Sequence, residues 1–408
     1  MDRHEWRSIS ISSLGRIVTG KTPTSTRPEL FGDQFPFITP SDLAFDRPHV
    51  VTERYLSPAG RESQKNLLLP TQTVCFTCIG ATIGKLCVTV APSFTNQQIN
   101  SVIVNGAEHD SWFVYYLLRR HGNAIASIAG GAATPIVNKT TFSGFEVTVP
   151  PRPTQHKIAS ILSAYDDLIE NNTRRIAILE EMAQAIYREW FVHFRFPGHE
   201  TVQLVDSPLG KIPMGWDVKP ARHVVEIRYG KNLPKTKILS EGKYPVYGAG
   251  SVIGFNDFAI VEGRVALVTC RGNGSGTIWR TRESAFVTNN SLMITPKPEQ
   301  ESWSFGFIEL HLKYSNVAGV ISGSAQPQIT IDGLSTVLML VPSKSIVADF
   351  CYQIDVMNDE VDCLYGKNRN LRTTRDLLLP KLISGQLDVE DLDIDVGPIA
   401  DELEHMTV

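Results

Sequence analysis

The sequence predicts an α/β (α+β) fold: two tandem globular domains, each followed by a long helix, with the two helices paired as an antiparallel coiled coil of pseudo-twofold symmetry. Two stretches, residues 158–190 and 350–382, carry mostly apolar residues at alternating steps of four and three. This 3.5-residue period is typical of a coiled-coil seam. The stretches begin 192 residues apart (350 − 158), and the segments before them share a common frame. Each seam needs an apolar partner, and the other seam supplies one.

The first globular domain is expected over residues 1–152. Runs rich in Val, Ile, Thr and Phe, separated by Gly, Pro and Asn, predict strands of a mostly antiparallel sheet. These runs are residues 35–39, 73–77, 86–90 and 101–104. Residues 111–121 carry Trp112, Tyr115, Tyr116 and Leu118 at helical spacing, which predicts a helix with one apolar face. The chain then enters the first long helical segment, residues 153–197.

The second globular domain, residues 198–343, repeats the first. A Trp-to-Gly spacing of 14 residues recurs, from Trp6 to Gly20 and from Trp216 to Gly230. A tandem duplication keeps its core pattern while its binding loops diverge. The first copy takes 58 steps from Gly20 to Cys78, whereas the second takes 40 from Gly230 to Cys270. We therefore expect two different binding surfaces.

The remaining residues divide into a second helical segment, 344–386, and an acidic tail, 387–408. Residues 343–408 carry 6 Lys+Arg against 14 Asp+Glu, a net charge of −8, so the rest of the chain carries 33 (39 − 6) against 29 (43 − 14). The globular domains are thus mildly basic, which permits contact with phosphate groups. We interpret the tail as solvated, and a docking strand for a partner is the alternative.

Nothing in the sequence indicates secretion or membrane insertion. No stretch approaches 18 consecutive apolar residues, and the charged N-terminus is not followed by an apolar signal region. We therefore expect a cytoplasmic protein. The six cysteines lie mostly in apolar runs, where we expect free buried thiols and no disulfide.

Motifs for catalysis and metal binding are incomplete. Residues 80–86 read GATIGKL, which is one residue short of a P-loop and lacks its Ser or Thr. Cys75 and Cys78 form a lone C-x-x-C pair without a second pair at zinc spacing, and on a strand they would face opposite sides. The Asn/Asp-Pro-Pro-Tyr/Phe tetrapeptide of amino-methyltransferases is absent. We expect neither catalytic residues nor a metal site.

Three helical-region motifs and the two domain openings resemble a known family. The motifs are PPRPTQHKI at residues 150–158, WFVHFRFPG at 190–198 and LLLPKLISG at 377–385. The domains open with Trp6…Gly20 and with PMGW at residues 213–216 followed by Gly230. Over nearly its whole length the chain resembles the specificity (S) subunit of a type I restriction-modification system.

The resemblance implies a non-catalytic, sequence-specific DNA-binding subunit. Each globular domain would be a target recognition domain for one half of an asymmetric bipartite site. The helices would be the conserved spacer that docks two N6-adenine methyltransferase (M) subunits, and two restriction (R) subunits would join in some complexes. This chain would hold no cofactor: S-adenosylmethionine would bind the M subunits, and ATP and Mg²⁺ the R subunits.

The seam also supports a spacer on physical grounds. Residues 158–190 span 33 positions, roughly 50 Å at ~1.5 Å per residue, against a rise of about 3.4 Å per base pair. We expect antiparallel pairing in which facing positions sum to 540. Asn172 would then face Asn368, Tyr165 would face Arg375, and Ala183 would face Met357. Two amides facing each other in an apolar seam set the register, unless either amide lies at a splayed, wet end of the pair.

The residues expected to contact DNA lie in polar, Gly-rich loops between strands, where glycine lets the backbone approach phosphate and polar side chains supply donors. In the first domain they are Lys21, Thr22, Thr39, Ser41, Thr82, Lys85, Asn96, Gln97, Gln98 and Asn138. In the second they are Lys231, Tyr247, Arg271, Asn273, Ser275, Asn289, Asn290, Gln326 and Gln328. A structural interpretation stays open for some: Gly80, Gly84, Gly272 and Gly276 only shape hairpins, and Asn96 and Asn289 are buried turn residues.

A second function from another class fits the same architecture. A coiled-coil protein-interaction scaffold would carry two domains that bind peptides or glycans. Affinity for duplex DNA that falls steeply with salt favours the first function, and salt-insensitive peptide binding favours the second.

Overall fold

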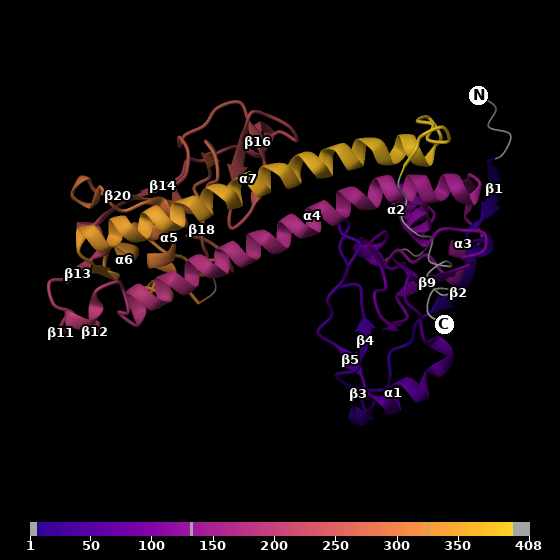
Figure 1. Cartoon of the computed structure of the whole chain (residues 1–408), viewed down its shortest axis with the longest axis horizontal. Coiled ribbons are helices and arrows are strands. Elements are labelled where there is room, and N and C mark those ends of the chain that lie inside the picture. The colour runs from indigo at the N-terminus through magenta and orange to yellow at the C-terminus, as the bar shows by residue number, and fades with distance from the viewer. Residues whose placement is uncertain (1–5, 131–133, 325, 395–408) are drawn as a thin grey trace. The chain divides into compact units, whose positions relative to one another are not determined.

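The computed structural model describes residues 6–130, 134–324 and 326–394, which fold into two compact units (Figure 1). Unit 1 is formed from Met1–Asn171 and Lys367–Val408, and unit 2 from Asn172–Gly366. The two long helices, α4 (Arg152–Tyr187) and α7 (Lys344–Ile383), therefore contribute residues to both units. Most of the predicted acidic tail lies outside the described residues.

The core of unit 1 is a four-stranded antiparallel sheet that contains three of the four expected strands, and the fourth, at residues 35–39, belongs to a smaller sheet. Its order is β2 (Gly15–Thr19), β9 (Ile99–Val104), β6 (Val74–Thr77) and β7 (Leu86–Val88). A smaller sheet contains β3 (Phe31–Gly32), β5 (Tyr55–Leu56), β4 (Phe35–Ile38) and β8 (Phe94–Thr95), of which β4 and β8 are parallel. β1 (Arg7–Ser10) pairs with β10 (Glu146–Val149). The short helices are α1 (Pro58–Ser63) and α3 (Lys139–Ser143).

Helix α2 (Ser111–Ser127) covers one face of the main sheet of unit 1. It begins at Asp110, whose carboxylate accepts a hydrogen bond from Phe113 N at 2.9 Å, a typical N-cap. Along β6, Phe76 belongs to the cluster under α2, while Cys75 belongs to the cluster on the opposite face. This alternation follows from the two-residue period of a strand. It explains why the C-x-x-C cysteines are buried in different clusters.

Unit 2 repeats the strand order of unit 1, which confirms the tandem duplication. Its main sheet has the order β14 (Val225–Tyr229), β20 (Ser291–Pro296), β17 (Ala266–Thr269) and β18 (Ile278–Arg280). A second sheet contains β16 (Val252–Asn256), β15 (Tyr244–Tyr247) and β19 (Phe286–Val287), with β15 and β19 parallel. β11 (Leu204–Ser207) pairs with β12 (Gly210–Pro213), and β13 (Asp217–Pro220) pairs with β21 (Leu338–Val341). The helices are α5 (Phe305–Lys313) and α6 (Ile331–Ser335).

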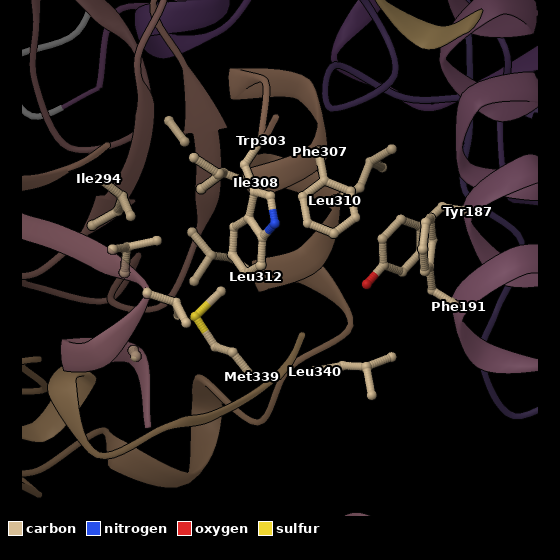
Figure 2. Close-up of a cluster of buried hydrophobic side chains, with 14 of the residues drawn as sticks. Tyr187, Phe191, Ile294, Trp303, Phe307, Ile308, Leu310, Leu312, Met339 and Leu340 are labelled. Atoms are coloured by element: carbon tan, nitrogen blue, oxygen red, sulfur yellow. The ribbon is translucent and has the colours of Figure 1, made fainter. Parts of the chain in front are cut away.

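Aromatic side chains fill the core of unit 2. Figure 2 shows Tyr187, the last residue of α4, and Phe191, in the helical turn Arg188–Val192 that follows it, on the side of the cluster next to Phe307 of α5. The ring centroids of Phe191 and Phe307 are 5.2 Å apart, and those of Trp303 and Phe307 are 4.9 Å apart. Edge-to-face contacts at these separations add stability beyond burial alone. The end of α4 is thereby anchored in the domain that follows it.

The repeated glycine of each domain opening has a steric cause. A Cβ atom on Gly20 would lie 2.2 Å from the carbonyl oxygen of Thr95, and one on Gly230 would lie 2.2 Å from that of Thr288. Both distances are far inside van der Waals contact. The same close approach of two backbones therefore requires glycine in both copies.

Within each unit the long helices pack antiparallel, as expected. In unit 1, Ile158 of α4 and Leu382 of α7 share one buried cluster. In unit 2, Ile176 of α4 and Leu364 of α7 share another. Both pairs sum to 540. Ala183 and Met357 also belong to one cluster of unit 2, Ala183 as a buried member and Met357 as a partly buried residue packed against it.

Two polar seam residues, Asn368 and Arg375, have partners that the seam pairing did not specify. Asn368 is buried and donates to Ile169 O at 3.3 Å, while the pairing of Asn368 with Asn172 stays a prediction. The guanidinium of Arg375 pairs with the buried carboxylate of Asp166, not with Tyr165. The Arg375 side chain is long, so its guanidinium can extend beyond Tyr165 and reach the carboxylate of the neighbouring Asp166.

All six cysteines are free, and only Cys363 is exposed. Burial raises the pKa of the Cys78 thiol to about 12, so this thiol is protonated at neutral pH. Among the described residues, no group of three or more His, Cys, Asp or Glu side chains is placed to hold a metal ion. No helix in the same residues is sufficiently long and apolar to cross a bilayer.

Candidate nucleic-acid interface

In unit 1 the loops that follow β2, β4 and β8 meet at one edge. Because β4 and β8 are parallel, both chains leave the sheet on the same side. Asn96 N donates to Ile38 O at 3.2 Å, and Lys21 N donates to Thr95 O at 2.9 Å. The expected residues Lys21, Thr22, Thr39, Ser41, Asn96, Gln97 and Gln98 lie on these three loops.

The other expected residues of unit 1 lie on loops joined to this edge. Cys78 N donates to Gln98 O at 2.8 Å, and Val137 N donates to Cys78 O at 2.9 Å. These bonds connect the β6–β7 turn, which carries Thr82 and Lys85, and the segment before Asn138. Lys85 Nζ lies 3.5 Å from Pro40 O. The structure thus brings together all ten residues that were expected from sequence.

Several of these ten side chains are occupied in holding the loops. Thr39 is 3% exposed and its hydroxyl donates to Asp42 at 2.8 Å. Asn96 is 9% exposed and its side-chain oxygen accepts from Gln98 N at 3.1 Å, as the buried-turn interpretation states. Asn138 caps α3 by accepting from Thr141 N at 2.9 Å. The Thr82 hydroxyl donates to Ile79 O at 2.6 Å.

The exposed members of the group present polar atoms to solvent. Lys21, Thr22, Ser41 and Gln97 are all exposed. The Thr22 hydroxyl donates to Gln97 Oε1 at 2.8 Å, which leaves the Gln97 amide group as a donor. These four side chains are the better candidates for contact with phosphates or base edges.

The equivalent loops of unit 2 meet in the same way. Lys231 N donates to Val287 O at 2.9 Å, and Thr288 N donates to Tyr247 O at 2.9 Å. Cys270 N donates to Asn290 O at 2.8 Å, and Gly272 N donates to Pro327 O at 3.1 Å. These bonds gather the expected residues Lys231, Tyr247, Arg271, Asn273, Ser275, Asn289, Asn290, Gln326 and Gln328.

Tyr247 is placed in the core rather than on the loop surface. It is 5% exposed, its ring lies 5.2 Å from that of Trp279, and its hydroxyl accepts from Arg282 N at 3.1 Å. Burial raises the pKa of this phenol. The Ser275 hydroxyl is also engaged, donating to Pro327 O at 2.8 Å. Lys231, Arg271, Asn273, Gln326 and Gln328 are exposed.

The loops that carry the ten expected residues of unit 1 form one loop group, and those that carry the nine of unit 2 form another. Glycines shape the turns of both loop groups. Gly80, Gly84, Gly272 and Gly276 have φ values of 59°, 92°, 83° and 92°. Residues with side chains rarely adopt these angles. Turn geometry thus accounts for glycine at all four positions, as the structural interpretation states.

In a basic segment of unit 2, the search for loop residues found Lys231 but missed three further lysines. Residues 229–243 contain four lysines, Lys231, Lys235, Lys237 and Lys243, against the single acid Glu241. All four are exposed, and in the described part of the chain the first three form no ion pair. A local charge count would have found this segment, because an excess of like charge in a short loop is typical of phosphate contact.

Three arginines of unit 2 are committed to the protein instead. Arg280 is 7% exposed and pairs with Glu309 at 2.7 Å. Asp362 of α7 receives Arg264 Nε and Arg282 Nη1, both at 2.7 Å. Burial alone would raise the pKa of Glu309, but Arg280 and Lys313 outweigh it and lower that pKa. This cluster fixes the main sheet to α7 and is not free to bind DNA.

A cavity in unit 2 contains none of the expected residues. Its volume is about 720 Å³, and its lining includes Tyr187, Phe191, His311 and Leu340. His311 is buried, and its Nδ1 lies 2.7 Å from the Tyr187 hydroxyl. Burial lowers the pKa of His311 to about 3, so it is neutral at physiological pH. The neutral imidazole and the Tyr187 hydroxyl are hydrogen-bond partners within this lining.

Comparison with known proteins shows the family to which the chain belongs. The family model described as type I restriction modification DNA specificity domain matches residues 3–181 and 213–353. The MjaIX specificity subunit of Methanocaldococcus jannaschii is 25% identical over 95% of both chains. The HindI specificity subunit of Haemophilus influenzae is 35% identical over 41% of this chain and 38% of its own length.

A solved structure shares the fold. The S subunit of a type I restriction-modification system from M. genitalium matches with a TM-score of 0.63 at 18% identity, covering 94% of this chain and 97% of its own. The family match covers two copies of the domain, each including one of the loop groups. The chain therefore belongs to the type I restriction-modification DNA specificity family, as a non-catalytic specificity subunit that recognises a DNA target.

Proposed function

We propose that each unit reads one half of an asymmetric bipartite DNA target and that the chain directs N6-adenine methyltransferase subunits to that target. The observation that carries the proposal is the loop group, built twice on the same strand order with different side chains. Because the two units share one strand order, both would present their loops to a DNA duplex in the same orientation. Different loop residues give them different sequences to read.

The asymmetry of the target follows from the loops. Unit 1 has 58 steps between Gly20 and Cys78, including β3, β5 and α1, whereas unit 2 has 40 between Gly230 and Cys270. Unit 2 carries the lysine-rich segment 229–243. The exposed lysines would neutralise phosphates, and Arg271, Asn273 and the exposed glutamines would meet base edges.

The long helices supply the spacer in this proposal. α4 has 36 residues and α7 has 40, roughly 54 Å and 60 Å at ~1.5 Å per residue. Such lengths exceed one turn of B-DNA, about 34 Å. Two M subunits would dock on the helical regions and bring S-adenosylmethionine, and R subunits would add ATP and Mg²⁺. The complex would act on DNA in the cytoplasm.

The proposal can be tested by measuring how tightly duplex DNA is bound by the complex that this chain forms with its methyltransferase subunits. We expect affinity that falls steeply with salt and a preference for one sequence in a randomised duplex library. Salt-insensitive binding of peptides or glycans, without affinity for DNA, would instead identify an interaction scaffold. Arg271→Ala should weaken binding by ~1 to 3 kcal/mol and relax one base position if Arg271 reads guanine. An equal loss on every sequence would assign Arg271 to phosphate.

A further inference from the structure

Two adjacent apolar side chains are exposed at the tip of the β15–β16 hairpin of unit 2. Val252 is 47% exposed and Ile253 is 45% exposed. They follow the turn formed by residues 248–251, where Gly248 N donates to Ser251 O at 2.8 Å. Polar residues dominate the neighbouring loops. An apolar pair at this place cannot form hydrogen bonds to bases through its side chains.

A β-bulge explains why both side chains are exposed. In the β15–β16 register, Val246 pairs with Gly254 and Tyr247 pairs with Val252, so Ile253 has no partner residue. Successive side chains of a regular strand point to opposite faces, and a bulge re-aims them. The Ile253 side chain lies over Gly248: a Cβ there would be 2.8 Å from Ile253 Cγ2. The bulge and the glycine together hold Ile253 at the tip.

The tip is surrounded by the loops assigned to DNA. Lys231 N donates to Val287 O, and β19 pairs with β15, so Lys231 lies at the same end of the sheet as Tyr247 and Val252. On the other side, a Cβ on Gly274 would lie 4.0 Å from Ala249 O, which places the 271–277 loop beside the turn. Leu239 and Phe255 exchange backbone hydrogen bonds at 2.9 Å, which ties the lysine-rich segment to β16.

Unit 1 has an apolar side chain at the equivalent place in the repeat. β4 corresponds to β15, since each pairs in parallel with the short strand β8 or β19. The loop after β4 carries Phe45, which is 54% exposed, and Lys85 Nζ lies 5.8 Å from the centre of its ring. In unit 1 the exposed ring lies beside a cation, and in unit 2 the exposed pair lies at the end of the sheet that also carries Lys231.

We propose that these apolar tips, Val252 with Ile253 in unit 2 and Phe45 in unit 1, are wedges that enter between adjacent base pairs of the target and unstack them. The proposal deepens the proposed function and rests on it. DNA is the occupant that fits, because Lys231, Lys235 and Lys237 are exposed and form no ion pair within the described residues. Their segment is joined by backbone hydrogen bonds to β19 and to β16, the strand that carries the tip. A wedge also explains why apolar side chains, which cannot hydrogen-bond to DNA, lie among the polar loops.

The physical exchange favours such a wedge. Exposed apolar surface is unfavourable in water, and insertion between bases buries it. Unstacking one base step costs a few kcal/mol, and the resulting bend brings more protein surface onto the phosphates. The cost depends on the step, and pyrimidine–purine steps open most easily. The wedge would thereby add specificity at a step that no polar side chain reads.

Fluorescence of 2-aminopurine tests the wedge. The wild-type complex, with its methyltransferase subunits and without S-adenosylmethionine, is bound to duplexes carrying the sequence that it methylates. 2-Aminopurine replaces one base at a time, and the methylated adenine is left unchanged. We expect fluorescence to rise several-fold at one step in the half read by unit 2. Ile253→Ala should remove most of this rise and weaken binding about tenfold, the loss of one partly buried aliphatic contact.

Matched variants separate the wedge from general damage. Ile253→Met keeps the apolar bulk and should retain the signal, whereas Leu204→Ala, at a residue 50% exposed on β11, should change neither signal nor affinity. Phe45→Ala should act only in the other half of the target. Sequence-specific binding without a fluorescence rise at any step, or a full rise with Ile253→Ala, overturns the wedge alone. Absence of any sequence preference overturns the proposed function itself.

Discussion

Replacing Arg375 by Met should destabilise unit 1 strongly. The side chains of Arg375 and Asp166 are 1% and 3% exposed, and they form an ion pair in the interior. The Asp166 carboxylate also accepts from the Tyr116 hydroxyl at 2.6 Å, and Arg375 Nη1 donates to Asp46 O at 3.2 Å. Burial alone would lower the pKa of Arg375, but the Asp166 and Asp376 carboxylates outweigh it and raise that pKa.

The magnitude follows from removing one partner of a buried pair. Arg375→Met leaves a buried carboxylate without its cation, which costs ~3 to 5 kcal/mol of unfolding free energy. Asp166→Leu leaves a buried guanidinium and should cost a similar amount. The double variant contains neither charge, so its loss should be smaller than the sum of the two single losses by at least ~2 kcal/mol.

Urea unfolding of the four proteins in this double-mutant cycle measures the coupling. The exposed pair Arg27–Glu29, with side chains 57% and 55% exposed, is the control, and Arg27→Met should leave the unfolding midpoint unchanged. Additive losses from the two single variants, with a coupling below ~0.5 kcal/mol, would show that the buried pair does not hold α4 against α7 in unit 1.

Three further results are expected. Lys235→Ala and Lys237→Ala should each lower the slope of log affinity against log salt concentration by ~1, while leaving sequence preference unchanged; an unchanged slope removes them from the interface. Asn138→Ala and its counterpart Thr330→Ala, which caps α6 at 3.0 Å, should each cost ~1 kcal/mol in thermal unfolding, and a loss of DNA affinity without a loss of stability would give Asn138 a direct contact. His311 has a pKa of about 3 in the folded chain and ~6.5 in the unfolded chain. Between these two values, His311 is protonated in the unfolded state and neutral in the folded state. Stability should therefore fall by ~2 kcal/mol between pH 6.5 and 5 from this residue; His311→Gln should lack that part of the pH dependence, and an identical pH profile would contradict a neutral buried imidazole.

The long-range pattern of this chain could be predicted because it depends on periodicity. The 3.5-residue seam locates α4 and α7, and the offset of 192 residues relates β6, β7, β9 and β10 to β17, β18, β20 and β21. The loops could also be located, because polar, glycine-rich segments between strands can be recognised in the sequence, whereas the parallel pairs β4–β8 and β15–β19 that bring them to one edge were not predicted. These features follow from backbone geometry, which sequence spacing reports directly.

Individual side chains were predicted less well, for physical reasons. Tyr247 precedes a glycine, as a loop residue would, yet it is the last residue of β15, which lies between β16 and β19. The ion pair of Arg375 with Asp166 was not predicted, although Asp166 is next to Tyr165, the residue expected to face Arg375. Helical spacing does not show how far a guanidinium reaches. The bulge at Ile253 depends on strand register, which the sequence does not state.

Mapping methylated adenines is the most direct measurement on this protein. Genomic DNA is sequenced from cells with the chain and its methyltransferase partner, and from cells that lack the chain. If two unlike readers are held at one separation, methylation that depends on the chain falls in two different short specified sequences separated by a constant number of unspecified bases. A single continuous motif, two identical halves in inverted order, or a map that is the same without the chain would contradict this reading of its two units.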